Sequence, residues 1–367
     1  MSKERKRICQ QVDSLQKQLE SYPNKVKLKI KQEILNETIC SDDSEFTRKG
    51  QIAIYDKMIS TAEKYSKKYG IDLVRFFSEI SSTPKEKSQR AKSLPKEFEI
   101  FSKLYKSVLR LKKGLENGIR GEYEAYKTIK VLDDEIQLFQ NLCVPFQNST
   151  EEHDIIAITT RGIFTLEIKY FSARFVTITK QGLVSIGKDF VGDTSMGDRG
   201  LHKKRPKNVI EQAQRHKHSL RRLLKNTEFE SVPVYPVFVY SNDKCTVYDE
   251  ELDQSNLCTC YRTGIENIIL DEKRPICLSK EEIYSLRSLL EYECGGIEER
   301  TYPLSITESS FYEALAAFIS LQVANMEEKR IKKEISKSKK ALNEIDRNRD
   351  EAIGMGAGIL LNFFRNL

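Results

Sequence analysis

The start of the chain carries apolar residues at helical spacing. Ile8, Val12, Leu15 and Leu19 follow one another at steps of four, three and four, between Lys, Glu and Gln residues. This heptad-like stripe predicts a helix that packs against a partner helix. Because proline lacks the backbone N–H that a helix needs, Pro23 is expected to interrupt this helix.

The rest of residues 1–113 also reads as helical. Residues 81–95 (SSTPKEKSQRAKSLP) predict a loop or a helix junction, and a longer helix is expected over residues 96–117. We find no catalytic set of residues in this section. We therefore expect a helical, coiled-coil-like region that serves packing or oligomerisation, with itself or with a partner protein.

After residue 113 the apolar pattern shortens to the period of β-strands. Helices are expected over residues 123–132, 208–225 and 280–293, the last with Ser279 as its N-cap. Strands are expected over residues 136–144, 153–159, 162–171, 174–179 and 232–241. A helix, a run of strands, a helix and a strand predict a mixed α/β domain over residues 114–300.

The chain turns helical again from Ser309 to about Ile353. Dense charges of both signs with few apolar residues favour an exposed or coiled helix. The tail of residues 352–367 (AIGMGAGILLNFFRNL) is apolar and rich in Gly, but it is too short to span a membrane. We expect it to dock on protein, in preference to touching a bilayer surface. The third expected domain is therefore residues 301–367.

Composition adds few constraints. Lys and Arg exceed Asp and Glu by 61 to 54, a charge of +7, which suits a polyanionic partner or an ordinary basic protein equally well. The eight cysteines show no two-residue spacing of a zinc or redox site, and Cys258 and Cys260 are one residue apart. We expect buried, reduced thiols in a cytoplasmic protein. The N-terminus lacks the apolar run of a signal peptide, and no transmembrane segment is expected.

Candidate chemistry begins with two charges in a strand that is otherwise apolar, residues 162–171 (GIFTLEIKYF). A buried charge is costly unless it is paired or bound to a metal. Because residues two apart in a strand face the same side, Glu167 and Lys169 should point into one site. Leu166, Ile168 and Tyr170 should then pack on the opposite side.

A second acid, Asp154, stands thirteen residues before Glu167, at the start of another apolar strand. Residues 159–162 (TTRG) between the two strands predict a tight turn, so the strands should form a hairpin. Asp154 can then lie opposite the region of Glu167 and Lys169. Paired carboxylates suit a hard cation such as Mg²⁺, which could polarise a phosphodiester and activate a water molecule.

These residues carry a specific resemblance. Asp154 followed by Glu167-Ile168-Lys169 resembles the D…ExK signature of the PD-(D/E)xK nuclease superfamily, and within it the nuclease-related domain (NERD) family. Residues 118–129, 150–171 and 205–224 resemble the opening helix, the central hairpin and the following helix of that family. The resemblance leaves the N-terminal third and the C-terminal helices unexplained, and Tyr170 stands where the family more often has asparagine.

The resemblance implies a restriction-endonuclease-like mixed sheet flanked by helices, with one or two Mg²⁺ or Mn²⁺ ions at its edge. By the same resemblance Asp154, Glu167 and the backbone carbonyl of Ile168 would be metal ligands, and Lys169 would position water or stabilise charge. Glu122 would assist as a further ligand or through a bridging water, and Gln212 would support the site from its helix. On their own, Glu122 could equally be a charged helix-surface residue, and Gln212 a satisfied polar residue at a helix–sheet contact.

Two further features are weaker. His216 and His218, with His202 nearby, could suggest zinc, but residues two apart on a helix do not face each other. Arg215, Arg222 and Lys225 fall near one helical face and could contact nucleic-acid phosphates, although a solvated helix face explains them almost as well.

The leading hypothesis is a metal-dependent endonuclease that cuts DNA, with defence against foreign DNA as its expected role and helical arms for self-association or partner docking. The alternatives are a nuclease-like module that binds nucleic acid or a partner protein without cutting, and a helical scaffold that the central domain only stabilises. Retention of the acids together with the lysine favours the first.

Overall fold

The structure is a computed structural model. It describes residues 3–38, 40–41, 45–81, 95–133, 135–186, 189–190, 208–249, 252, 257–295 and 301–365, without the side chains of 22–23, 79–81, 186, 189–190 and 352–365. The described chain divides into two compact units. Met1–Asp42, Asp56–Leu109 and Ile306–Leu367 supply the first, and Asp43–Tyr55 and Arg110–Ser305 supply the second. The three consecutive domains expected from the sequence stay a prediction.

Helices make up the first unit. They are α1 (Lys3–Glu37), α2 (Arg48–Lys68), α3 (Leu73–Ser81), α5 (Lys96–Lys130) and α9 (Glu308–Arg365), of which α2 and α5 also contribute residues to the second unit. Aromatic rings fill its core, where the Phe101 ring stacks 4.5 Å from Phe318 and the Phe76 ring lies 4.6 Å from Phe318. These contacts join α3, α5 and α9.

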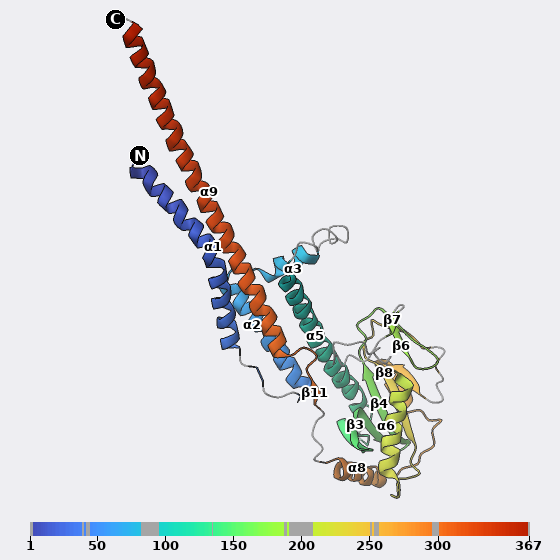
Figure 1. Ribbon diagram of the computed structural model, residues 1–367. Helices are drawn as coiled ribbons and strands as arrows, with labels where there is room; N and C mark the ends of the chain where they lie inside the picture. Colours follow the sequence, from blue (N-terminus) through green and yellow to red (C-terminus); the bar gives the residue numbers. More distant parts are fainter. Residues whose placement is uncertain are drawn as a thin grey trace. The chain divides into compact units, whose positions relative to one another are not determined.

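The predicted stripe on α1 has its partner helix within the same chain. Ile8, Val12 and Leu15 form one buried cluster with Ile331 and Ile335 of α9. The two helices run antiparallel (Figure 1), and Arg5 near the start of α1 donates from Nε to Asp346 Oδ1, in the second half of α9, at 2.8 Å. The expectation of helix pairing is therefore confirmed.

The expected break at Pro23 is wrong, because α1 continues through this residue to Glu37. A proline removes one backbone hydrogen bond from a helix. Ile30 and Ile34, which follow the proline, are both buried, and their burial holds the second half of the helix in place.

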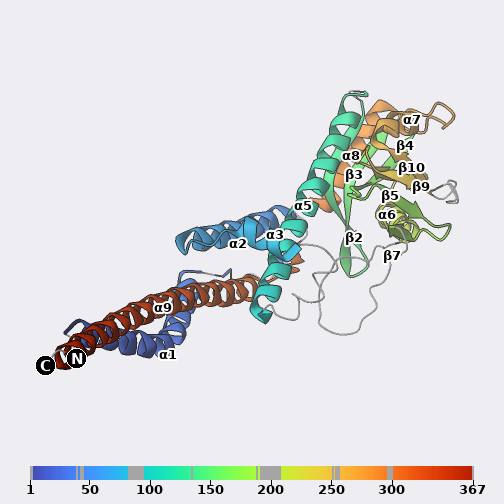
Figure 2. The same cartoon turned by 90° about the horizontal axis from the view of Figure 1, so that it is seen from above.

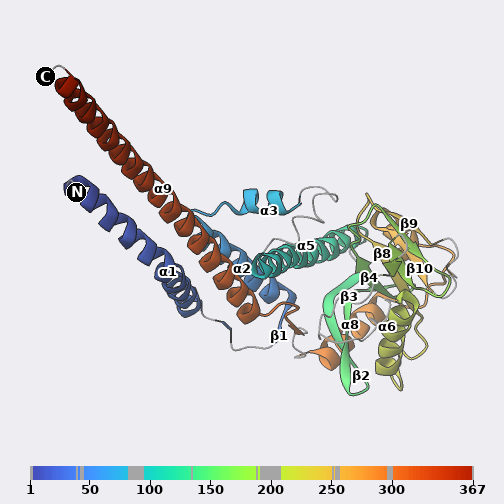
Figure 3. The ribbon, with the colours of Figure 1, turned by 45° about the horizontal axis from the view of Figure 1, so that its top comes forward.

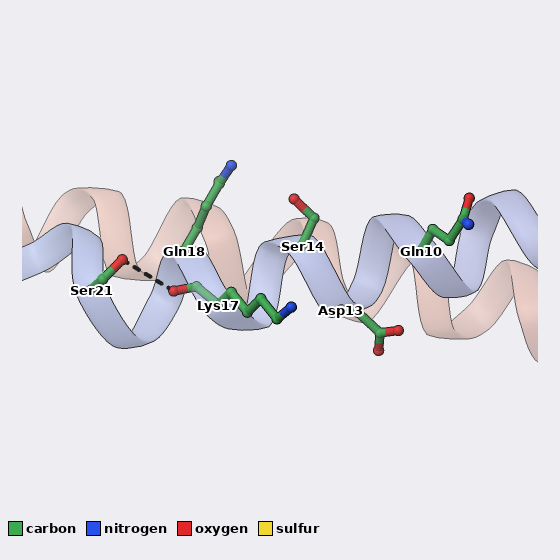
Figure 4. A pocket seen from close by; sticks show the side chains of 6 residues that line it. All are labelled: Gln10, Asp13, Ser14, Lys17, Gln18 and Ser21. Atoms are coloured by element: carbon green, nitrogen blue, oxygen red, sulfur yellow. Dashed lines mark hydrogen bonds between the residues drawn. The ribbon is translucent and has the colours of Figure 1, made fainter.

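A polar pocket of about 490 Å³ lies along α1. All of its lining side chains come from one stretch of this helix, and Ser21 turns its hydroxyl back to the carbonyl oxygen of Lys17 at 3.2 Å (Figure 4). The lining consists of Gln10, Asp13, Ser14, Lys17, Gln18 and Ser21. Such a pocket between polar side chains of a single helix is an ordinary solvated surface.

The second unit is built on a mixed five-stranded sheet in the order β10-β8-β4-β3-β2. The strands β2, β3 and β4 pair antiparallel, whereas β4, β8 and β10 pair parallel. Their bounds are β2 Gln137–Phe146, β3 Ser149–Thr159, β4 Gly162–Lys169, β8 Val234–Tyr240 and β10 Cys258–Tyr261. The predicted mixed α/β fold and the predicted β3–β4 hairpin are confirmed.

Two smaller sheets complete this unit. A four-stranded sheet has the order β7-β6-β5-β9, so the strand expected over residues 174–179 belongs to a sheet of its own. Its strands are β5 Phe175–Ile178, β6 Val184–Ile186, β7 Asp189–Phe190 and β9 Thr246–Tyr248. A two-stranded ribbon pairs β1 (Glu45–Phe46) antiparallel with β11 (Tyr302–Pro303).

Helices cover both faces of the five-stranded sheet (Figures 2 and 3). On one face α6 (Val209–Leu224) and α8 (Lys280–Cys294) pack on Ile156 and Ile158 of β3. On the other face α5 and α7 (Ile265–Ile269), which follows the short 3-10 helix η1 (Arg262–Gly264), pack on Ile155 and Leu166. Ser279 caps α8 as predicted, with Glu282 completing the capping box.

The helices expected over residues 96–117 and 123–132 form one continuous helix, because α5 runs from Lys96 to Lys130. It passes Gly118 and Gly121, which weaken a helix. The buried Ala125 and Ile129 anchor its last turns on the sheet. Gly121 itself allows close approach, because a Cβ there would lie 2.4 Å from the Ser241 Oγ.

The remaining expectations concern the cysteines, the loop, the apolar tail and membrane-spanning helices. All eight cysteines are free thiols, but Cys40 and Cys277 are exposed, so the expectation of buried thiols is wrong for these two. The expected loop falls mostly on residues 82–94, and the apolar tail on side chains 352–367, all outside the described part of the chain. Among the described helices, none is long and apolar enough to cross a membrane.

Candidate active site on β3 and β4

The β3–β4 hairpin brings the predicted acids together. Gly162 in its turn has φ of 126°, which favours glycine, and a Cβ there would meet the Pro233 carbonyl oxygen at 2.6 Å. The pairing runs from Thr159↔Gly162 to Ile155↔Leu166, so the next register step places Asp154 opposite Glu167. The Ile168 backbone N–H donates to Asp154 Oδ2 at 2.7 Å.

The carboxylate of Glu167 is the centre of this arrangement, although its residue is only 3% exposed. Its Oε1 accepts a hydrogen bond from Gln212 Nε2 at 2.6 Å and another from Lys169 Nζ. The two strand charges therefore face one site, as the alternation predicted. Leu166 and Ile168 lie in the core on the other face, while Tyr170 is half-buried just beyond the strand.

The helix α6 delivers Gln212 from its first turns. Its N-cap is Asn208, whose side chain accepts from the backbone N–H groups of Ile210 and Glu211 at 3.0 and 3.1 Å. Val209 and Ala213 are buried and fix the rotation of the helix against the sheet. Gln212, between them, can then reach Glu167.

A second acidic group surrounds Arg48, the first residue of α2. The guanidinium binds Glu122 Oε1 through Nη1 and Glu152 Oε1 through Nη2 at 2.7 Å. The same Nη2 lies 3.9 Å from Asp154 Oδ1. Burial lowers the pKa of Arg48, but the charges of Glu122, Asp154 and Glu152 outweigh it, and the pKa rises. The guanidinium therefore stays charged and links Glu122 to Asp154.

Glu122 is buried, and its environment favours the protonated carboxyl group more than water does. Burial, and after it the charge of Asp154, raise the pKa of Glu122 to about 7, against the opposing effect of Arg48. Glu122 thus differs from an exposed helix acid, which is the alternative that its sequence context left open.

Polar groups from distant parts of the chain support this acidic group. The Tyr302 hydroxyl donates to Glu152 Oε2, and the Gln51 side chain donates from Nε2 to the Tyr302 carbonyl oxygen at 2.9 Å. Arg48 Nη2 also donates to Asn141 Oδ1 at 3.2 Å. A pocket of about 410 Å³ opens beside the pair of Arg48 and Glu122. Its lining is Arg48, Lys49, Ile119, Glu122, Tyr123, Gln140 and Asn141.

Two buried histidines lie behind Glu167. The ring of His216 is 4.4 Å from that of His153, and its Nε2 lies 3.5 Å from Glu167 Oε2 and 3.4 Å from Glu151 Oε1. His153 contacts Thr165 Oγ1 at 3.1 Å and Ser219 Oγ at 2.9 Å. Burial, and then the neighbouring His216, keep the pKa of His153 well below its ordinary value.

The donor chemistry of the site suits a hard divalent cation. Asp154, Glu167 and the Ile168 carbonyl would offer oxygen ligands, and Mg²⁺ is commonly held by one or two carboxylates with water completing its shell. Within the described residues no group of three or more His, Cys, Asp and Glu side chains is arranged to hold a metal ion. A cation here would therefore depend on the carbonyl and on water in addition to the two carboxylates.

The other sequence candidates are placed as follows. His216 is buried and His218 is exposed, so the two do not converge, and His202 lies outside the described residues. Arg215 binds Glu151 through Nε at 3.3 Å, and Arg222 is exposed on the same helix. Lys225 follows the helix as its C-cap, and the contact of these three residues with nucleic acid stays a prediction.

Arg48, Glu152 and Tyr302 were not anticipated from the sequence. Glu152 stands two residues before Asp154, and this acidic neighbour was the available signal. Arg48 precedes Glu122 by 74 residues, and Tyr302 follows Glu152 by 150, so no local pattern could connect them.

Comparison with known proteins supports the nuclease-like character of this region. Searches of curated proteins and of solved structures found no match. Residues 117–241 match the model of the family described as the nuclease-related domain. This range includes every site residue predicted from the sequence, from Glu122 to Lys225. This part of the chain is therefore similar to the nuclease-related domain, as the sequence resemblance predicted.

Proposed function

We propose that this protein is a metal-dependent nuclease that hydrolyses phosphodiester bonds, with DNA as its substrate. The observation that carries the proposal is the convergence of Asp154, in the middle of β3, with Glu167 and Lys169 at the end of β4. A family match to the nuclease-related domain over the same residues supports it. Burial of a charged carboxylate costs free energy. A strand with a purely structural role would not need a buried carboxylate that binds both a lysine and a glutamine.

Each side chain has a proposed task. Asp154, Glu167 and the Ile168 carbonyl would hold Mg²⁺ or Mn²⁺, which when bound polarises the phosphodiester and makes a water molecule more acidic. Lys169 would orient the attacking water or stabilise negative charge on the phosphate. Gln212 holds the Glu167 carboxylate in position through its 2.6 Å hydrogen bond. Glu122 would assist from α5, and Arg215, Arg222 and Lys225 would contact phosphates of the bound strand.

A direct assay tests the proposal. The purified full-length protein is incubated with plasmid, linear duplex, single-stranded DNA and RNA, in Mg²⁺, Mn²⁺ or EDTA. We expect cleavage of DNA with either metal and none in EDTA. Glu167→Gln and Lys169→Ala should each lower the rate by about 100-fold or more, because each removes a charge at the reacting phosphate. Lys180→Ala, which alters an exposed lysine, serves as the matched control.

One observation favours a second candidate. The guanidinium of Arg48 already compensates Glu122, Glu152 and Asp154, as it would in a nuclease-like module that binds nucleic acid or a partner without cutting. Retention of DNA by the protein in a gel-shift assay, with no cleavage in any metal, would support this candidate and contradict the nuclease. Cleavage that survives both substitutions would show that the active site lies elsewhere.

A further inference from the structure

Arg48 brings a fixed positive charge to the acidic cluster from outside the family match, which begins at residue 117. Its side chain is 20% exposed and contacts Glu122 and Glu152, with Asp154 at 3.9 Å. Two of these three acids, Glu122 and Asp154, belong to the proposed active site. Arg48 therefore supplies a positive charge to both of these acids from within the chain itself.

The segment that carries Arg48 is anchored on both sides. Before it, β1 pairs with β11 through Phe46↔Tyr302. After it, Gln51 binds the Tyr302 carbonyl oxygen, and the Tyr302 hydroxyl binds the same Glu152 that Arg48 contacts. This closed set of contacts fixes where the guanidinium lies, so its position beside the acids is built into the fold.

We propose that Arg48 is a positioning residue that holds Glu122 and Asp154 in place when no divalent cation is bound, and that it competes with a divalent cation for these carboxylates. The inference rests on the proposed function, because that proposal makes Asp154 a metal ligand. It concerns a residue that the family match does not cover.

Electrostatics gives the competition its direction. A divalent cation on Asp154 would lie close to the guanidinium, and like charges a few ångströms apart repel strongly where water is partly excluded. Arginine cannot escape this repulsion by losing its proton, because its pKa is too high. The competition should therefore persist at every pH at which the protein is folded.

The neighbouring pocket provides space for the exchange. Arg48 and Glu122 both line its cavity of about 410 Å³, together with the exposed Lys49. When a cation takes its place at Asp154, the guanidinium can turn into this cavity while it keeps its contact with Glu122. A lysine at this position would offer a single point charge and could not bridge two carboxylates in the same way.

Binding of Mn²⁺ to the full-length protein tests the proposal, measured by calorimetry at about pH 8.5, which lies above the raised pKa of Glu122. Arg48→Gln should bind Mn²⁺ about tenfold more tightly than the wild type, equivalent to about 1.4 kcal/mol. Its melting temperature in EDTA should be lower than that of the wild type, and saturating Mn²⁺ should narrow the difference. Lys49→Gln, an exposed neighbour that lines the same pocket, should bind as the wild type does.

Two outcomes would overturn the inference in distinguishable ways. Equal or weaker Mn²⁺ binding by Arg48→Gln, with binding still abolished by Asp154→Asn, would reject the role of Arg48 and leave the metal site intact. Failure of every variant and of the wild type to bind Mn²⁺ would reject the metal site of the proposed function, and the competition with it. If Arg48→Gln does not fold, Arg48→Lys provides the comparison, because lysine cannot bridge the two carboxylates. It should bind Mn²⁺ more tightly than the wild type, and equal or weaker binding would reject the role of Arg48.

Discussion

At the scale of single residues, Glu167 shows how a buried carboxylate is stabilised. One oxygen accepts from Gln212 and Lys169, while the other lies 3.5 Å from His216 Nε2. Burial of an isolated charge is unfavourable, but hydrogen bonds from charged and neutral donors offset that cost. The proposed ligand is thus oriented before any cation arrives, which reduces the loss of side-chain entropy on binding.

The buried His153 makes stability depend on pH. Its pKa is well below the ordinary value when folded, so the unfolded chain takes up a proton that the folded protein refuses. The free energy of unfolding, measured by urea denaturation in EDTA, should therefore be unaffected by this group above about pH 6.5. Below that pH the same group should lower the free energy of unfolding by up to about 1.4 kcal/mol per pH unit.

Replacement of the histidine checks the assignment. His153→Gln should remove this part of the pH slope, whereas His218→Gln, which changes an exposed histidine on α6, should retain it. An unchanged slope in His153→Gln would mean that another group takes up the proton.

At the scale of elements, α5 is placed by a glycine where it crosses the end of the sheet. A Cβ on Gly121 would lie 2.4 Å from Ser241 Oγ and 3.0 Å from Ser241 Cβ. Ser241 in turn donates from its backbone N–H to the Lys169 carbonyl oxygen at 3.0 Å. The distance between α5 and β4, and hence the position of Glu122 relative to Lys169, depends on this small residue.

Two matched glycine substitutions on α5 test this point. Gly118→Ala meets no atom within 4 Å and should stabilise the protein by about 0.5–1 kcal/mol, the usual gain in a helix. Gly121→Ala should destabilise it by about 1–3 kcal/mol, because overpacking outweighs that gain. Denaturant titration measures both, and the added change Ser241→Gly should restore stability to Gly121→Ala. Equal stabilisation by the two substitutions would refute the close approach.

At the scale of the whole molecule, the apolar stripe of α1 is satisfied by α9. Ile8, Val12 and Leu15 are buried against Ile331 and Ile335, which stand more than 300 residues later in the chain. Self-association through helical arms, expected from the stripe, remains a prediction, but the stripe itself does not require a second copy.

Substitution of Ile331, which is 1% exposed, should release α1. A carboxylate cannot be buried there without a partner, so Ile331→Asp should lower hydrogen-exchange protection across residues 3–37 by at least about tenfold. Protection of β3 and β4 should not change, and Lys333→Asp, an exposed site on α9, should leave α1 protected.

Mass in solution gives the second readout of this substitution. The mass of Ile331→Asp should equal that of the wild type if the helix pair forms within one chain. A fall from dimer to monomer would show that the two helices belong to different copies.

Local pattern was sufficient for much of the fold and for the centre of the site. The strand alternation placed Glu167 and Lys169 on one face, and the turn at residues 159–162 set the register that brings Asp154 opposite them. The helix of residues 208–225 followed from the local pattern, and that of residues 280–293 also from its Ser279 cap. These features depend on residues close together in sequence, whose geometry the backbone period dictates.

The errors arose where distant contacts outweigh local preference. Pro23 and Gly121 disfavour a helix locally. Burial of Ile34 in α1 and of Ile129 in α5 stabilises these helices enough that they continue through the two residues. Tertiary packing of an apolar face commonly exceeds the propensity of a single residue.

The sequence by itself thus determined the hairpin, its acids and lysine, and the mixed α/β class of the domain that carries them. Only the tertiary structure decided that Arg48 and Tyr302 meet the acidic cluster and that α9 is the partner of α1. The physical reason is range: a strand or helix period relates neighbours within a few residues. The pairing of a charge or an apolar stripe over tens to hundreds of residues depends on how whole elements pack.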